Sequence, residues 1–225
     1  MNIITSAKKL LWPLVSVGAA TGLLLVSGAA SRHHARVVVG LPHPGENAWE
    51  LIGRSDQDGP VVRHYGYLTH VFGLPDEALF SIAGARTEAT ARFTYFGTTT
   101  LTARHALGNI IQTAAPGALT IYFNPAPAGD FNDPDSFRRG QAVASFSVRY
   151  HNVLYVEAPD IGISSSSAAL EQTHMGLFEL ESRRVHFGRP GLRARFQGIA
   201  QSMRTQADPL KAVFFLSGST VRAAD

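Results

Sequence analysis

Residues 141–157 constrain the fold of this chain more than any other stretch, because apolar and polar side chains alternate along them. The stretch reads QAVASFSVRYHNVLYVE, and Asn152 is the one break among its apolar even positions. This period of two predicts a half-buried β-strand. The stretch is much longer than a typical strand of about 5–6 residues. It is therefore either one bent strand of a barrel or long sandwich, or two strands that turn near His151 and Asn152.

The rest of the chain shows shorter alternations of the same kind, separated by turn residues. We predict further strands at residues 61–74, 87–103, 106–112, 118–123, 161–172, 175–181, 183–187, 192–201 and 212–216. One helical turn is expected at residues 75–79, and no extended helical periodicity is present. About ten short strands at roughly even spacing predict an all-β fold, namely a single-domain antiparallel β-barrel or β-sandwich.

Two local features refine this prediction. Pro116 and Gly117 form a turn-type pair, so we expect the chain to turn between residues 106–112 and 118–123. Residues 212–216 (AVFFL) are apolar on both faces, which predicts a central strand covered on both sides. Long strands without helices are compatible with lipocalin-like or allene-oxide-cyclase-like barrels at the level of fold alone, since no motif matches.

Composition limits the class of protein. Hydrophobic residues make up 45% of the 225-residue chain, which is enough for a core. Cysteine is absent, which excludes disulfides, thiolate zinc sites and cysteine nucleophiles. Without residues 1–30, which contain Lys8 and Lys9, the formal charge falls from +3 to +1. No run of basic residues is present, so we predict no nucleic-acid partner.

The N-terminus has the order of a secretory signal peptide. A basic start with two lysines precedes an uncharged apolar segment at residues 10–30, which ends in small residues before Arg32. We therefore predict that residues 1–30 are a signal peptide and that the protein is secreted or lies in the periplasm or cell envelope. The alternative is an uncleaved anchor, in which residues 10–30 hold the protein at a membrane. Residues 31–47 are then a linker or a loose first strand, and residues 48–225 are the all-β domain.

Residues 124–140 are the longest break in the strand pattern and contain one cluster of potential metal ligands. Asp130, Asn132, Asp133 and Asp135 offer oxygen atoms of the kind that calcium prefers. However, Pro134 stands where the EF-hand pattern needs a ligand, and no glutamate closes the loop. The alternative is a solvated turn in which these side chains cap their own backbone. Apart from this calcium candidate we predict no cofactor.

The polar face of residues 141–157 supplies the catalytic candidates. Arg149, His151 and Glu157 lie at odd positions and share one face of the predicted strand. In a sandwich this face meets solvent. In a hollow barrel the same residues line the mouth of a pocket, where His151 and a carboxylate act as an acid–base pair. The histidines show no metal-binding spacing such as HExxH, and no GxSxG, GxxxxGK or GxGxxG motif is present.

The absence of a catalytic motif favours binding over catalysis. We predict an exported all-β protein that binds a small apolar molecule inside a barrel, or another protein along a sheet face. One alternative is a small β-barrel enzyme, such as a cyclase or isomerase, with a polar cluster in an apolar pocket. A third interpretation is a structural domain associated with the cell envelope.

Overall fold

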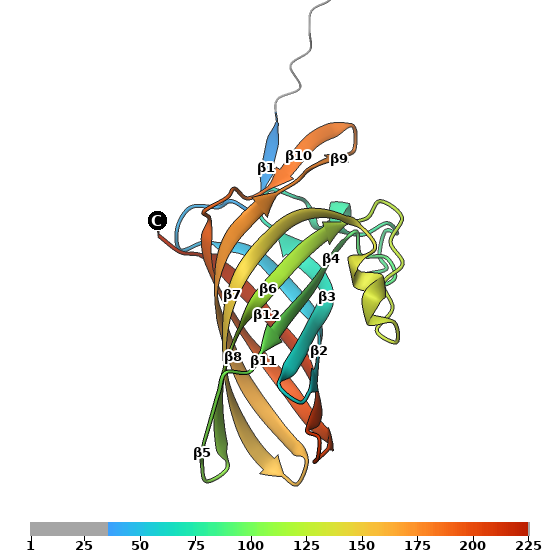
Figure 1. The fold of residues 1–225 in the computed structure, drawn as a ribbon. Coiled ribbons are helices and arrows are strands. Elements are labelled where there is room, and N and C mark those ends of the chain that lie inside the picture. Colours follow the sequence, from blue (N-terminus) through green and yellow to red (C-terminus); the bar gives the residue numbers. More distant parts are fainter. Residues whose placement is uncertain (1–35, 225) are drawn as a thin grey trace, which may run out of the picture. The chain divides into compact units, whose positions relative to one another are not determined.

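A computed structural model describes residues 36–224, and within them eight antiparallel strands close into a barrel (Figure 1). Strands that follow one another in the chain pair side by side, and the last strand pairs with the first, as in an up-and-down barrel. The predicted all-β antiparallel fold is confirmed, and it is a barrel rather than a sandwich. The barrel strands are β2 (Asn47–Asp58), β3 (Val61–Val71), β4 (Phe93–Thr100), β6 (Ile110–Phe123), β7 (Gln141–Ala158), β8 (Ile161–Met175), β11 (Arg193–Gln206) and β12 (Lys211–Arg222).

The stretch that dominates the sequence is one continuous strand, β7, and it does not turn at Asn152. Its even-numbered side chains face the barrel interior, and Phe146, Val148 and Asn152 are all buried. Its pairing register shifts once with β6, between Ile121 and Tyr122, and twice with β8. Such irregularities bend a strand, which allows one long segment to follow the barrel wall.

The predicted turn at Pro116 and Gly117 is wrong, because β6 runs straight through both residues. On one side β6 pairs first with β5 (Ala103–Leu107) and then with β4, and Pro116 lies between the two registers. The missing N–H of the proline therefore breaks neither ladder. Gly117 allows β4 to come close, since a Cβ atom at this position would lie 2.1 Å from the carbonyl oxygen of Thr98. The pair marks a change of partner strand.

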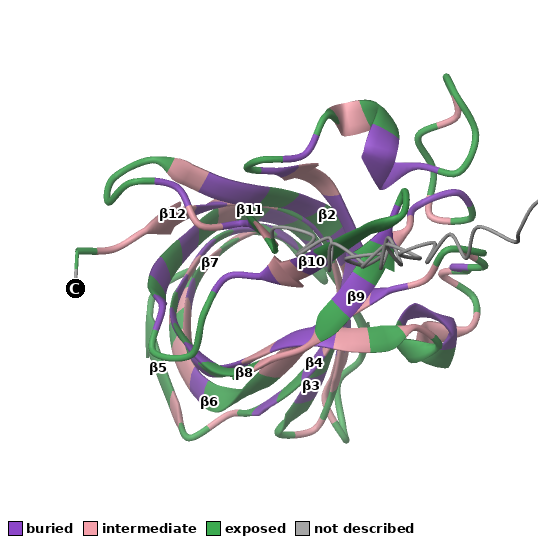
Figure 2. Cartoon of the chain, turned by 90° about the horizontal axis from the view of Figure 1, so that it is seen from above, coloured by how far each residue is buried: buried purple, intermediate pink, exposed green. Residues whose placement is uncertain are grey.

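The two ends of the barrel differ in how they are closed. All the long connections meet at one end, where a small sheet of β1 (Val37–Val39), β10 (Arg183–Phe187) and β9 (Leu177–Leu180) crosses the opening (Figures 1 and 2). The segments 72–92, with the 3₁₀ helix η1 (Asp76–Leu79), and 124–140, with η2 (Pro134–Arg138), also lie there. The opposite end has the hairpin of β5 with β6 and the short turns 59–60, 108–109, 159–160 and 207–210 (Figure 1). One end is therefore covered and the other is not.

Aromatic side chains fill the covered half of the barrel. The Trp49 ring lies 5.4 Å from the rings of both Phe146 and Phe187, so it joins the barrel interior to β10 of the small sheet. Phe178 of β9 contacts Phe123 at 4.8 Å between ring centroids. Such pairs add roughly 0.5–1.5 kcal/mol each beyond the burial of their area. This half is a packed core, and Val39 of β1, which belongs to the predicted linker, is fully buried in it.

The segment 124–140 packs against the outer wall of the barrel. Phe131 and Phe137 lie 6.1 Å and 5.5 Å from the outward-facing ring of Tyr65. The hydroxyl of Thr94 donates a hydrogen bond of 2.7 Å to the carbonyl oxygen of Phe137. This long connection is therefore fixed by apolar burial outside the barrel and leaves the interior free.

Candidate functional site

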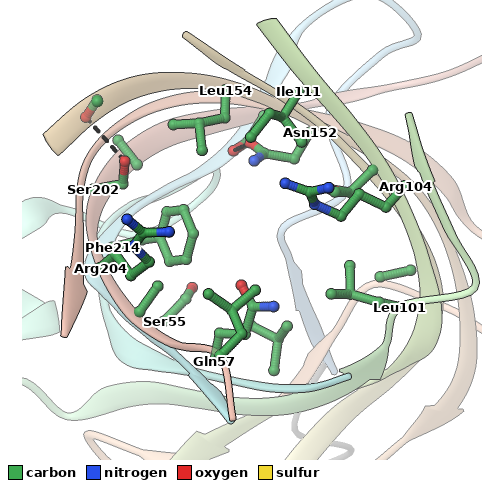
Figure 3. A pocket seen from close by; sticks show the side chains of 18 of the residues that line it. Ser55, Gln57, Leu101, Arg104, Ile111, Asn152, Leu154, Ser202, Arg204 and Phe214 are labelled. Atoms are coloured by element: carbon green, nitrogen blue, oxygen red, sulfur yellow. Dashed lines mark hydrogen bonds between the residues drawn. The ribbon is translucent and has the colours of Figure 1, made fainter. Parts of the chain in front are cut away.

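The uncovered end of the barrel contains a cavity of about 220 Å³ (Figure 3). Several of the side chains that point inward at this end are small, which leaves space for the cavity. The small lining residues are Ser55, Ala115, Gly162, Ser166, Ala200 and Ser202. The short turns at this end provide no segment to cover the opening.

Apolar side chains make up most of the cavity wall. Among the larger ones, four strands and the turn before β12 contribute Val62, Ile111, Leu154, Val156, Leu210 and Phe214. An apolar wall with a few polar groups is typical of small-molecule sites in proteins. The volume lies below the range of about 300–1,000 Å³ for drug-sized ligands, so the space suits a small ligand.

A hydrogen-bonded histidine forms the floor of the cavity. His64 on β3 is 7% exposed, with its Nδ1 atom 2.7 Å from Oγ of Ser55 and its Nε2 atom 2.9 Å from Oγ1 of Thr99. Burial lowers the pKa of His64 from 6.5 to about 4, so the ring is neutral at pH 7. A neutral imidazole has one N–H and one lone pair. It therefore donates to one of the two hydroxyls and accepts from the other.

Tyr150 completes the floor from β7. Its ring centroid lies 5.0 Å from that of His64, and burial raises the pKa of its phenol, which stays protonated at neutral pH. Two residues further along β7, the Oδ1 atom of Asn152 accepts a hydrogen bond of 2.8 Å from Ser166. Polar groups at the floor thus come from β2, β3, β4, β7 and β8.

A second, smaller cavity of about 40 Å³ lies beyond this floor and shares His64, Thr99 and Tyr150 with the first. Its wall includes the hydroxyls of Tyr95 and Thr220, which are buried and have no hydrogen-bond partner among the described residues. Burial raises the pKa of Tyr95 well above its usual value. The interior therefore contains a larger outer cavity and a smaller inner one, and His64, Thr99 and Tyr150 lie between them.

Two arginines lie at the rim of the large cavity. Arg104 on β5 and Arg204 on β11 both point into the opening from different sides (Figure 3). The Nε atom of Arg204 lies 2.6 Å from Oδ1 of Asp160 in the turn between β7 and β8. Asp160 is the only carboxylate that lines the cavity within the described part of the chain.

The structure places the predicted catalytic candidates away from this cavity. Arg149 and Glu157 are exposed on the outer wall of β7, and His151 pairs there with Gln112 at 2.7 Å between Nε2 atoms. The same strand does contribute to the cavity, but through its even-numbered residues. Asn152, the polar residue that interrupts the apolar face, was the signal in the sequence for an interior polar site. His64 had no such signal, because its partners lie on other strands.

The calcium candidates lie in the segment 124–140, outside the barrel. Oδ1 of Asp130 accepts the backbone N–H of Asn132 at 2.8 Å, as in a self-capping turn. Asp133 pairs with Arg139, and Asp135 lies 3.2 Å from Arg138. Across residues 36–224, no group of three or more histidine, aspartate or glutamate side chains is arranged to hold a metal ion. Calcium binding here stays a prediction.

The predicted signal peptide or anchor at residues 1–30 lies outside the described residues. In the part of the chain that the structure describes, no helix has both the length and the hydropathy to cross a membrane. Comparisons of the chain with protein-family models, with curated proteins and with solved structures find no match. The cavity itself is therefore the basis for a functional proposal.

Proposed function

We propose that this protein binds a small apolar molecule in the cavity at the uncovered end of its barrel. The observation that supports the proposal is the cavity of about 220 Å³ with a mostly apolar wall. A packed core normally leaves few voids larger than a water molecule. The covered half of this barrel is closer to that rule, because Trp49 and its aromatic neighbours are in contact and the cavity beside them measures only about 40 Å³. The contrast between the halves favours a binding site.

We also propose that the binding protein is exported, because residues 1–30 have the pattern of a signal peptide. A chain without cysteine has no disulfides, so its stability in an oxidising compartment depends on its hydrophobic core. The aromatic side chains in the covered half of the barrel form such a core. The mass of the protein recovered from the exported fraction tests this point. A mature chain that begins near Ser31 supports export with cleavage, and a chain that begins at Met1 contradicts it.

Filling the cavity tests the binding proposal. We expect N-phenyl-1-naphthylamine, a neutral apolar fluorophore, to bind the wild-type protein saturably with increased fluorescence. Ala115→Phe places a ring in the cavity, because Ala115 lines it and is 3% exposed. This variant should bind the fluorophore at least tenfold more weakly. Ala169→Phe adds the same ring to an exposed position on β8 and should bind like the wild type.

Thermal unfolding of both variants establishes that they are folded before binding is compared. If Ala115→Phe does not fold, Ala200→Leu on β11 adds a smaller group to the same cavity. A wild-type protein that shows no saturable binding contradicts the proposal. Equal binding by Ala115→Phe and Ala169→Phe contradicts it as well, because the fluorophore would then sit elsewhere.

A small-barrel enzyme is the second candidate function, and His64 is the observation that favours it. A neutral histidine between two hydroxyls at the floor of an apolar cavity is able to accept a proton from a bound molecule. Its pKa of about 4 makes it a weak base, however, and no carboxylate orients it. We therefore rank catalysis below binding. If a substrate is found, loss of turnover in His64→Gln with retained binding would support the enzyme.

A further inference from the structure

We infer that the molecule bound in the cavity is a small amphiphile with a single carboxylate, whose head group binds Arg104 at the rim and whose apolar tail points toward His64. This inference rests on the proposed binding function and adds the chemical class of the ligand. It follows from the charges at the rim, the polarity of the wall and the state of the floor.

Positive charge exceeds negative charge around the cavity. Among the described residues that line it, the groups charged at pH 7 are two arginines and one aspartate. His64 adds no charge because burial keeps it neutral. A cavity with low-dielectric walls and charge of one sign concentrates ligands of the opposite sign. The rim therefore favours an anion over a neutral or cationic ligand.

Of the two rim arginines, Arg104 is the one without a protein partner among the described residues. The structure gives its guanidinium no hydrogen bond and no ion pair within residues 36–224. The side chain leaves β5 and points into the opening, beside the apolar Leu101 and Ile111 (Figure 3). A guanidinium presents paired N–H donors that match the two oxygens of a carboxylate. This geometry suits a carboxylate head group.

Arg204 adds positive charge at another side of the rim (Figure 3). Its Nε atom is engaged by Asp160, which fixes the side chain at the turn between β7 and β8. The two Nη groups have no hydrogen bond to Asp160 and extend toward the cavity (Figure 3). Arg204 is thus a second, pre-positioned donor, whereas Arg104 is free to close on the ligand.

The floor determines the direction of the ligand. Ser55, His64 and Thr99 already satisfy one another by hydrogen bonds. Ser166 donates a hydrogen bond to Oδ1 of Asn152. A carboxylate at the floor would lose its hydration without meeting a cation, which is costly. An apolar tail, in contrast, gains burial against Leu154, Val156 and Phe214 on its way inward.

Isothermal titration calorimetry with two ligands of equal chain length tests the inference. Decanoate carries the carboxylate, and 1-decanol has the same chain without the charge. We expect the wild-type protein to bind decanoate at least tenfold more tightly than 1-decanol, because hydrogen bonds to charged groups are strong. Arg104→Gln should lose at least tenfold in affinity for decanoate and keep its affinity for 1-decanol. Higher salt should reduce the preference for decanoate.

Arg195→Gln is the matched control, because it removes the same charge from an exposed position on the outer wall of β11. It should bind both ligands like the wild type. Arg104→Lys separates charge from geometry and should retain part of the preference for decanoate. Arg104 and Arg195 are both exposed, so substitutions at these positions should preserve the fold.

The outcomes separate this inference from the binding proposal. If 1-decanol binds as tightly as decanoate, the carboxylate inference is wrong and the apolar binding site stands. If Arg104→Gln weakens the binding of both ligands equally, Arg104 contributes to the shape of the site and does not recognise the carboxylate, so the inference is wrong. If decanoate fails to bind while the neutral fluorophore binds, the ligand is not a carboxylate. If no ligand binds, both proposals fail.

Discussion

At the scale of single residues, His64 links the candidate site to the stability of the fold. Its neighbours are hydroxyls and the Tyr150 ring, so nothing beside it compensates a positive charge. Burial lowers the pKa of His64 from 6.5 to about 4. The unfolded chain therefore binds a proton at this histidine between pH 6.5 and pH 4, whereas the folded protein does not.

This difference predicts a pH dependence of stability. The free energy of unfolding should decrease as the pH falls from about 6.5 to 4, and His64 should contribute roughly 3 kcal/mol of that decrease. His64→Gln, which keeps hydrogen bonding to the hydroxyls, should flatten the curve in this range. Urea unfolding at several pH values measures the effect. His105→Gln, on the exposed face of β5, is the control, and an equal change in both variants would refute the role of His64.

At the scale of elements, the barrel closes where β4 meets β6, and Gly117 is a residue on which that meeting depends. A Cβ atom there would lie 2.1 Å from the Thr98 carbonyl oxygen and 2.7 Å from the Thr99 Cα atom. Both are backbone atoms, so no side chain is able to move aside. Thr99 also holds His64 at the floor of the cavity, so the same contact positions the site.

Gly117→Ala should therefore destabilise the protein by more than about 2 kcal/mol, in the range of backbone and overpacking effects. It should also weaken ligand binding, since Thr99 would shift with β4. Ala118→Ser, at the next position and exposed, should change stability by less than about 0.5 kcal/mol. Chemical denaturation of the three proteins measures the difference. A loss below about 0.5 kcal/mol in Gly117→Ala would show that the strands separate there without cost.

At the scale of the whole molecule, the barrel divides into a packed half and a hollow half. The same strands pass through both halves, so their two ends have different surroundings. In β7, Ala144, Phe146 and Val148 face the aromatic core, whereas Leu154 and Val156 face the cavity. Local opening is easier where few apolar contacts are buried.

Hydrogen exchange should therefore differ along a single strand. We expect the amides of residues 154–158 and 161–163 to exchange faster than those of residues 144–148, although both sets lie in paired strands. A ligand in the cavity should slow the first set and leave the second unchanged. Exchange followed by NMR or mass spectrometry gives the comparison. Equal protection along β7 would contradict the division into two halves.

Some features of this molecule follow from local pattern alone. The period of two along β7 specified which side chains share a face, and its even-numbered face is the interior. The hairpin of β9 and β10 was also predictable, because its turn at Glu181 and Ser182 is local. In contrast, residues 212–216 were expected to be covered on both faces, yet Phe215 is 53% exposed. In a closed barrel every strand has an outer face, and the sequence pattern does not indicate whether other segments cover that face.

The sequence by itself determined that this chain forms β-strands, because side-chain alternation and turn residues act over a few positions. It also determined that no disulfide supports the fold, since cysteine is absent. Only the tertiary structure decided where a cavity lies and which residues line it. Ser55, His64 and Thr99 meet because β2, β3 and β4 pair in one register, and register depends on contacts between distant segments. The uncovered end, and with it the candidate site, results from where the long connections fold.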